Sequence, residues 1–531
     1  MHRVTYSLKM KNIFYIAQIS YRNILFLSVF FPTALVQAQE VEVVEVTGIR
    51  QALPIQQAPY ALHKINTQQL QHGAATTLPE ALSEVPGVSI QKTANGQGSP
   101  FIRGFTGYRT LALIDGVRYN NSVYRDGPSE YFSLIDLQSL ENIEVINGSS
   151  SVLYGSDAIG GVLSLQSKTS SFQQEQEKFL FVEQSLRFSS GENSWISRTE
   201  LDIGSGQQWG LHAGLSLKYF GDIESAGLGR QAHTGYDVNA FDLRFDTQIN
   251  EQWLFTALHQ QLEQDDVWRT HKTIHALPFA GTSIGGDLRN LKDQQRQLNY
   301  VKLVGDNLDG YADKMHFLVS SQNWQEDADR IKGNSQRNIQ FFDSRMLGLE
   351  AQVTSYNSWG EWVYGLDFYR DKVDSGRQDF NSDGSLNRIR VQGAVGDDAV
   401  FDQAGVFLNW SHSLNDNWLL IFGGRYSKVH VNIGTYEDPL TGNAANYNNT
   451  WHDISRTLRL SHDLTGTQSH YLWAGYSESF RAPNVADISR YGNSRSSEIE
   501  IAATELSPEK FLTYEIGYKN LTNRLTTNLT Y

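Results

Sequence analysis

The sequence predicts a transmembrane antiparallel β-barrel that follows a small α/β domain. Three observations support this fold class. The chain begins with an export-signal pattern, continues with about 120 residues of mixed α/β character, and from about Phe179 alternates polar and apolar residues in segments near ten residues long. Alternation over that length is typical of tilted strands that cross an outer membrane.

The composition narrows the class of protein. The 531 residues carry a net charge of −14 and no cysteine, and 12% of them are aromatic although the mean hydropathy is −0.41. Aromatic girdles are common in membrane barrels, and an acidic chain is unsuited to nucleic acid, so we expect no nucleic-acid partner. The missing cysteines exclude disulfides and thiolate chemistry. No nucleophile elbow, zinc motif or paired carboxylates stand out, so we do not expect an enzyme.

Residues 1–38 read as a signal peptide. Lys9, Lys11 and Arg22 precede an apolar run over residues 24–35, and small residues lead to Ala38. A membrane anchor is the alternative, but the run is shorter than the ~18 residues that a spanning helix needs. No later segment is apolar enough for such a helix, so a membrane-spanning mature chain must be a closed barrel.

Residues 51–170 are predicted to form the compact α/β domain. Thr76–Val85 has the apolar spacing of a short helix, which Pro86-Gly87 ends. Four short apolar runs separated by turn signals follow, at residues 88–90, 111–114, 143–146 and 162–165.

Residues 171–531 are predicted to form part of a barrel. Over Trp209–Tyr219 the odd positions are apolar and the even positions are glycine or polar, and about fifteen segments of this kind precede Tyr531. Their connections are of two kinds: short ones, such as 204–208 and 415–417, and long polar ones, at 263–297, 374–402, 434–452 and 481–509. Short turns at one rim and long loops at the other are typical of outer-membrane barrels. A soluble β-sandwich or propeller is the alternative, since soluble sheets also alternate.

Several motifs in order resemble one family. They are Leu78-Pro79-Glu80-Ala81-Leu82, Phe101-Ile102-Arg103-Gly104-Phe105, Leu113-Ile114-Asp115-Gly116-Val117-Arg118, the run from Ile143 to Val162 with Leu153-Tyr154-Gly155, and Phe480-Arg481-Ala482-Pro483. The chain is similar to the TonB-dependent outer-membrane receptors. The resemblance implies a plug domain inside a barrel of 22 strands in the bacterial outer membrane, with membrane lipid around it.

The resemblance also implies a periplasmic partner, an extracellular ligand and a function. A segment at residues 39–50 resembles a TonB box, and its residues Glu42, Val43, Val44, Glu45, Val46 and Thr47 are expected to pair with the TonB complex in the periplasm. The function implied is energy-coupled uptake of a scarce extracellular nutrient, foremost a ferric siderophore or other iron chelate, with haem and cobalamin as alternatives. Haem receptors of the family carry a ligand histidine after the Phe480 motif, and this sequence has no histidine from Phe480 to Tyr531.

Two plug loops, Thr93–Pro100 and Tyr119–Phe132, are expected to face outward, and a long barrel loop adds further candidates. The predicted ligand-binding residues are Tyr119, Asn120, Tyr124, Arg125, Tyr131, Phe132, Trp268, His271 and His275. Aromatic faces beside an arginine suit a flat anionic chelate, and paired histidines suit haem iron. Packing of the aromatics on the barrel wall and simple solvation of the histidines are the alternatives.

No cofactor is expected, and calcium is the one alternative. Asp379, Asn381 and Asp383 alternate before Gly384 and could supply oxygen ligands to calcium. The acid expected at the twelfth position of such a loop is replaced by Arg390, so a polar turn is the favoured interpretation.

The strand count predicts a C-terminally truncated receptor. About fifteen strands fall short of the 22 of plugged transporters, and an open sheet in lipid exposes two unpaired edges. Three alternatives to an importer therefore stay open: a passive outer-membrane channel, an adhesion barrel, and an inactive truncated receptor.

Overall fold

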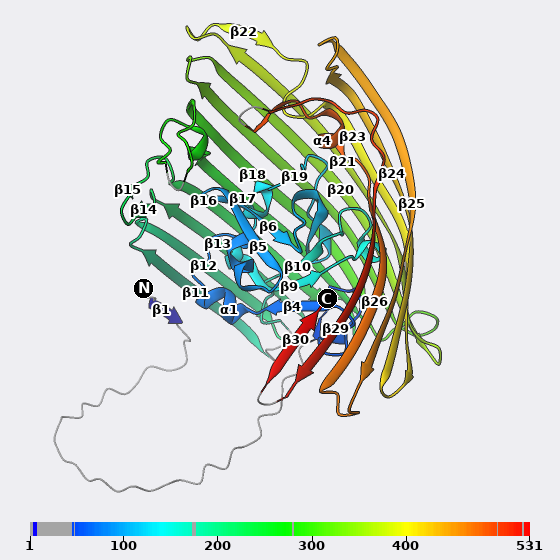
Figure 1. Ribbon diagram of the computed structural model, residues 1–531. Coiled ribbons are helices and arrows are strands. Elements are labelled where there is room, and N and C mark those ends of the chain that lie inside the picture. The colour runs from blue at the N-terminus through cyan, green and yellow to red at the C-terminus, as the bar shows by residue number, and fades with distance from the viewer. Residues whose placement is uncertain are drawn as a thin grey trace, which may run out of the picture.

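The computed structural model describes residues 4–7, 45–46, 48–172, 177–278, 281–495, 498–522 and 525–531. A large, strongly curved antiparallel sheet wraps around a smaller domain, whose elements lie inside the curve in blue to cyan (Figure 1). The predicted combination of an α/β plug with an antiparallel barrel-type sheet is confirmed.

The plug is built on a five-stranded mixed sheet. Its strand order is β4 (Ala61–Ile65), β9 (Leu140–Asn147), β10 (Gly161–Ser167), β7 (Thr110–Ile114) and β8 (Val117–Arg118). β10 and β7 run parallel and the other neighbours run antiparallel. A separate hairpin of β5 (Val88–Ala94) and β6 (Gln97–Ile102) lies beside this sheet.

Short helical turns connect the plug strands. They are α1 (Thr67–His72), α2 (Leu78–Ala81), η1 (Leu82–Glu84), η2 (Gly107–Arg109), η3 (Glu130–Ser133), η4 (Leu137–Ser139) and α3 (Ser151–Tyr154). The helix predicted over Thr76–Val85 is thus one short turn of α-helix continued by a 3-10 turn. Among the described residues, no helix is long and apolar enough to cross a membrane.

The large sheet has seventeen strands among the described residues. Fifteen of them follow one another as hairpins, β1 (Val4–Ser7) pairs beside β11, and β22 (Leu386–Ile389) branches from β21. The fifteen are β11 (Lys178–Ser189), β12 (Ser194–Ser205), β13 (Trp209–Phe220), β16 (Tyr236–Gln248), β17 (Trp253–Trp268), β18 (Asp287–Gly305), β19 (Lys314–Lys332), β20 (Arg337–Asn357), β21 (Gly360–Phe380), β23 (Asp397–Asn415), β24 (Trp418–Glu437), β25 (Ala444–Asp463), β26 (His470–Arg481), β29 (Glu509–Leu521) and β30 (Thr526–Thr530).

The strands are longer than the sequence predicted. β20 and β21 each have 21 residues, about twice the length that a tilted strand needs to cross the hydrocarbon. Their polar outer ends stay paired because each backbone N–H and C=O finds a partner in the adjacent strand, beyond the membrane as well as within it. The long polar loops predicted at 263–297 and 374–402 therefore shrink, with the strands extending to Trp268 and Phe380.

Alternation along the strands separates an inner and an outer face, as predicted. In β13 the even positions, among them Gly210 and His212, are buried, whereas Leu215, Leu217 and Tyr219 are exposed. The inner face packs directly on the plug: one apolar core joins plug residues such as Ile143 to wall residues such as Leu298. The plug is therefore not a loose insert.

The two rims of the sheet differ in their connections. One rim has turns such as 206–208, 358–359 and 416–417, and the other has longer segments such as 221–235, 269–286 and 482–508. Short turns belong on the periplasmic side of an outer-membrane barrel and long loops on the outside. We call the two sides the inner and outer rims.

Most of the predicted signal peptide, residues 1–38, lies outside the described residues, and its described part, Val4–Ser7, is paired with Glu183–Leu186 of β11. The predicted boundaries of the plug and barrel stay predictions, although Lys178 begins the first strand of the hairpin series.

Candidate functional site

A cavity of about 280 Å³ lies between the plug and the outer ends of β18 to β21. Its lining is strongly ionic, with eight basic and four acidic side chains. They are Arg125, Arg269, Lys292, Arg330, Lys332, Arg377, Arg390, Arg490, Glu130, Glu326, Asp329 and Glu500. We call this space the outer cavity.

The plug contributes a carboxylate to the outer cavity. Glu130, in η3, accepts hydrogen bonds from Lys292 at 2.5 Å and from Arg125 at 3.0 Å. Burial by itself would raise the pKa of Glu130, but Lys292, Arg125 and Arg269 outweigh it and hold that pKa well below its ordinary value. Glu130 is therefore ionised and offsets part of the positive charge where the plug meets the wall.

In the described part of the chain, three arginines nearer the outer rim use only their Nε groups in hydrogen bonds to carboxylates. Arg330 donates from Nε to Asp287 at 2.9 Å, and Arg377 and Arg390 donate from Nε to the two oxygens of Asp379 at 2.7 and 2.6 Å. Among the described residues, the terminal Nη groups of these arginines have no recorded hydrogen bond; one lies 3.8 Å from a further carboxylate. Nη groups that line a cavity in this way can bind the oxygens of an anion.

One outer segment turns inward onto the plug. α4 (Val485–Ser489) follows the Phe480 motif and is capped by Asn484, whose Nδ2 donates to the Tyr124 carbonyl at 2.7 Å. Ala486 N–H donates to the Ser122 carbonyl at 3.2 Å. The segment therefore joins an outer loop to the backbone of the plug.

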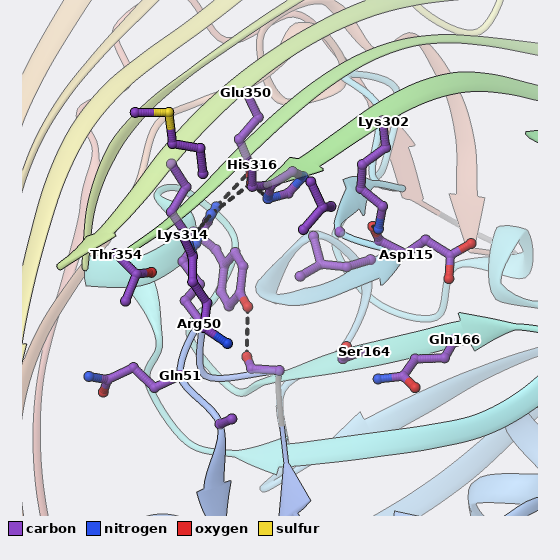
Figure 2. Close-up of a pocket in the computed structure, with 18 of the residues that line it drawn as sticks. Arg50, Gln51, Asp115, Ser164, Gln166, Lys302, Lys314, His316, Glu350 and Thr354 are labelled. Carbon is purple, nitrogen blue, oxygen red and sulfur yellow. Dashed lines mark hydrogen bonds and ion pairs between the residues drawn. The ribbon is translucent and has the colours of Figure 1, made fainter. Parts of the chain in front are cut away.

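A second cavity, of about 450 Å³, opens at the inner rim (Figure 2). Arg50 of the plug extends across it to Glu350 of β20 and forms a two-pronged ion pair with distances of 2.7 and 3.0 Å. The same guanidinium donates to Gln352 and to the Leu153 carbonyl, and it lies over the ring of Tyr154. Arg50 thus connects the N-terminal end of the plug to the barrel wall.

Two further bonds anchor the chain just before Arg50. The Gly48 N–H donates to the buried Glu144 carboxylate at 2.7 Å, and the Tyr154 hydroxyl donates to the Gly48 carbonyl at 2.7 Å. Figure 2 shows Arg50 and Gln51 of this segment among the side chains that line the cavity. The chain is therefore held from Gly48 onward.

We expect Arg50→Lys to loosen this anchor. A lysine keeps the charge but loses the two-pronged geometry, which removes about 1.5–3 kcal/mol of charge-assisted hydrogen bonding. The chain has no cysteine, so a spin label on Ala52→Cys reports only this segment, and its mobile fraction should rise. Arg230→Lys, at the exposed Arg230–Asp222 pair, is the control. An unchanged spectrum in Arg50→Lys would show that other contacts hold the segment.

Comparisons with known proteins agree with this geometry. Residues 54–162 match the model of the TonB-dependent Receptor Plug Domain. The vitamin B12 transporter BtuB of Vibrio vulnificus is 23% identical over 92% of this chain and 70% of its own length. An iron-regulated outer membrane virulence protein of Vibrio cholerae is 40% identical over 23% of this chain and 20% of its own length.

A solved structure shares the fold over most of the chain. The haemophore receptor HasR of Serratia marcescens, solved with its haemophore HasA and haem, superposes with a TM-score of 0.71 at 18% identity. The superposition covers 88% of this chain and 70% of HasR. The chain has the plug domain of the TonB-dependent receptor family and shares the fold of a solved receptor of that family. Members of this family are outer-membrane β-barrel proteins. BtuB is named as a transporter and HasR as a receptor, neither as an enzyme, as the sequence predicted.

Three of the receptor's predicted ligand-binding aromatics are not open to a ligand. Tyr119, Tyr124 and Phe132 are fully buried, and the rings of the two tyrosines lie 4.7 and 6.4 Å from that of Trp324. Apolar packing against the wall buries their faces, and none of the three lines the outer cavity, so a role for them in gripping a chelate stays a prediction. Asn120 is also buried and is occupied within the plug, where it bonds the backbone of Thr110 and Ala112 in β7.

The other predicted residues fall into two places. Arg125 and Tyr131 of the plug line the outer cavity. Trp268, at the end of β17, and His275, in the loop that follows, have ring centres 6.0 Å apart, and His271 is exposed in η5 (Thr270–Lys272) nearby. None of these three lines the outer cavity, so the predicted set does not form one site.

The predicted TonB box is described only in part. Glu42, Val43, Val44 and Thr47 lie outside the described residues. Glu45 and Val46 form β2 (Glu45–Val46), a short strand paired with β3 (Leu53–Pro54). Its role in binding TonB stays a prediction, and its extended backbone suits strand pairing with a partner.

The calcium candidate forms a hairpin between β21 and β22. The Asp379 carboxylate is bound by Arg377 and Arg390, and Asp383 accepts the backbone and hydroxyl of Ser385. No group of three or more histidine, aspartate or glutamate side chains suited to a metal occurs among the described residues. We do not propose calcium here, because the arginines already neutralise the principal carboxylate.

Sequence reasoning missed the arginines of the wall. Arg330, Arg377, Arg390 and Arg490 come from distant strands and loops, and pairing across the sheet and the inward loop bring them together. Arginine recurs at 377, 388 and 390, within the segment predicted as a polar loop, and this recurrence was the available signal.

Proposed function

We propose that this receptor imports an anionic, oxygen-rich metal chelate of the ferric siderophore class, with TonB as the energy source. The outer cavity supports this proposal, because the terminal donors of Arg330, Arg377 and Arg390 border it without a recorded hydrogen bond among the described residues. Guanidinium groups bind carboxylate and hydroxamate-type oxygens in a planar, two-pronged manner.

The relatives support the same direction without identifying the cargo. One is named for iron regulation and another for vitamin B12. The cavity is lined by eight basic and four acidic side chains, and carboxylates outside the lining pair with some of the basic groups. The excess of basic side chains in the lining favours a multiply charged anion over a neutral ligand. We therefore place an iron chelate ahead of cobalamin and haem.

Removing one of these arginines should weaken binding of an anionic probe. We expect Arg377→Ala to lower the affinity for ferric citrate about 10- to 100-fold, because one charge-assisted hydrogen bond contributes about 1.5–3 kcal/mol. Arg370→Ala is the matched control, since Arg370 is on the same strand but is exposed and pairs with Asp402. Quenching of intrinsic fluorescence on titration with ferric citrate, repeated with cyanocobalamin, gives both affinities.

Two results would contradict the proposal. One is tighter binding of cyanocobalamin than of ferric citrate. The other is ferric citrate binding that neither Arg377→Ala nor added salt weakens, since an ionic site must respond to screening.

A further inference from the structure

A cluster of two histidines and a tryptophan lies on the outer loops, apart from the outer cavity. His233 stacks on Trp268 with ring centres 4.0 Å apart, and the ring centres of His233 and His275 are 4.4 Å apart. His233 lies near the end of the segment between β13 and β16, and His275 belongs to the loop after β17. The two imidazoles therefore approach each other across two separate loops.

The position of His233 is fixed by its surroundings. Its φ of +59° is a left-handed conformation that non-glycine residues seldom adopt. The Thr270 hydroxyl donates to the His233 carbonyl, and the Asp222 carboxylate accepts the next two backbone N–H groups, of Thr234 and Gly235, at 2.8 and 3.0 Å. Strain held in place by several bonds often marks a functional position.

The ring nitrogens of this pair are free of recorded hydrogen bonds among the described residues. Other histidines of the chain differ: Nδ1 of His259, His430 and His470 lies within hydrogen-bonding distance of a neighbouring side chain. Imidazole nitrogens without a protein partner keep the lone pairs that a metal ion needs.

The spacing of the rings indicates the coordination geometry. With a metal–nitrogen distance of about 2.1 Å and roughly 1.1 Å from nitrogen to ring centre, two imidazoles bound at a right angle have centres about 4.5 Å apart. Opposite axial ligands of a haem would have centres about 6.4 Å apart by the same estimate. The observed 4.4 Å, with the ring planes tilted by 57°, fits adjacent positions on one metal ion and not a haem held between two histidines.

We propose that His233 and His275 form an outward-facing site for a divalent late transition-metal ion of the Cu²⁺ or Ni²⁺ class. Neutral imidazoles suit these metals, and right-angled positions suit their tetragonal geometry, whereas calcium and magnesium prefer oxygen ligands. The described residues supply no third histidine or acid for a closed metal site. The remaining positions are taken by water or by donors of a small chelator, so the ion stays exchangeable.

The test is metal titration of the untagged full chain in a non-coordinating buffer with detergent. CuCl₂ and NiCl₂ are titrated by calorimetry and by tryptophan fluorescence, because a metal on His233 lies beside the Trp268 ring and quenches it. The variants are His233→Ala, His275→Ala and the double variant. His462→Ala is the matched control, since His462 also stacks on a tryptophan, Trp418, at 4.0 Å.

We expect each single variant to weaken Cu²⁺ binding at least about tenfold, since even loss of an outer-shell partner costs 10- to 100-fold. His462→Ala should bind as the unaltered chain does. The electron paramagnetic resonance spectrum of bound Cu²⁺ should show coupling to two nitrogens in the unaltered chain and fewer in each variant. Trp268→Phe should retain the calorimetric binding while losing the quenching.

Cu²⁺ affinity and nitrogen coupling that are unchanged in the double variant would overturn the proposal, as would an equal loss in His462→Ala. Heat-dependent gel mobility shows whether each variant is folded, and His275→Gln, which keeps the size of the side chain, replaces any variant that is not. Ferric citrate binding at the outer cavity should be the same in all of these variants, so the two proposals fail independently.

Discussion

Deleting residues Glu42–Thr47 should abolish energy-coupled uptake and leave ligand binding at the outer cavity unchanged. The deletion ends just before Gly48, where the bonds to Glu144 and Tyr154 begin to anchor the chain to the plug. It removes β2 and its short pairing with Leu53–Pro54 but no contact of the outer cavity. Uptake of a radiolabelled ferric chelate, compared with equilibrium binding to whole cells, separates the two effects.

A pair of point variants sharpens this test. Strand addition uses main-chain hydrogen bonds, so Val46→Pro, which removes an N–H and fixes φ, should reproduce much of the deletion, whereas Val46→Ala should retain most of the uptake. Uptake that persists after both the deletion and Val46→Pro would favour a passive channel. Loss of binding together with uptake would mean that the segment supports the fold instead.

Local sequence patterns were sufficient to predict the elements of this receptor. The apolar runs at Leu111–Ile114 and Ile143–Ile146 became β7 and β9, and the alternation over Trp209–Tyr219 became a strand with one buried and one exposed face. These predictions succeed because successive side chains of a strand point to opposite faces, so its own residues determine which face is buried. Strand ends were predicted less well, since backbone pairing with the adjacent strand extends a strand through polar residues such as those near Phe380.

The candidate site was predicted less completely, for a different reason. Tyr119, Tyr124 and Phe132 have the chemistry of a ligand cage, but whether their faces are open depends on Trp324, some 200 residues away. Likewise, His233 joins Trp268 and His275 only because two loops meet in space. One sequence shows which residues can bind a ligand, whereas their exposure and partners arise from tertiary packing.

The contact between plug and wall offers the prediction with the largest expected effect on stability. Asp136, at the start of η4, accepts hydrogen bonds from Ser216 and Lys218, both at 2.6 Å, and lies 3.6 Å from Arg198. All of these side chains are buried. Arg198 has a second partner in Asp242, whereas Asp136 is the recorded ionic partner of Lys218 among the described residues. Neutralising Asp136 therefore leaves a buried ammonium without its counter-charge.

We expect Asp136→Asn to destabilise the seating of the plug by about 3–5 kcal/mol, the usual cost of removing one partner from a buried ion pair. Because the chain has no cysteine, the labelling rate of a single buried thiol, Ala112→Cys, reports plug opening. That rate should rise by about 100-fold or more, at 1.4 kcal/mol for each factor of ten.

Two controls test whether the unpaired buried charge causes the loss of stability. Asp136→Asn combined with Lys218→Met removes both charges and should recover most of the loss, as neutral replacements of buried pairs often do. Asp402→Asn makes the same chemical change at the exposed pair with Arg370, and an exposed ion pair contributes at most about 1 kcal/mol to stability. Equal labelling in Asp136→Asn and Asp402→Asn would show that the buried charges do not hold the plug.

The same pair predicts how plug seating depends on pH. Burial would raise the pKa of Asp136, but Lys218 and Arg198 outweigh it, so the pKa lies below its ordinary value in the folded protein. A carboxyl with a depressed pKa contributes its full stability above its unfolded pKa of about 3.9 and loses that stability as the pH falls toward the folded pKa. The difference in labelling rate between the unaltered chain and Asp136→Asn should therefore stay constant from pH 7 to about 5 and shrink below about pH 4. A difference that instead grows on acidification would mean that protonation of another group controls the opening of the plug.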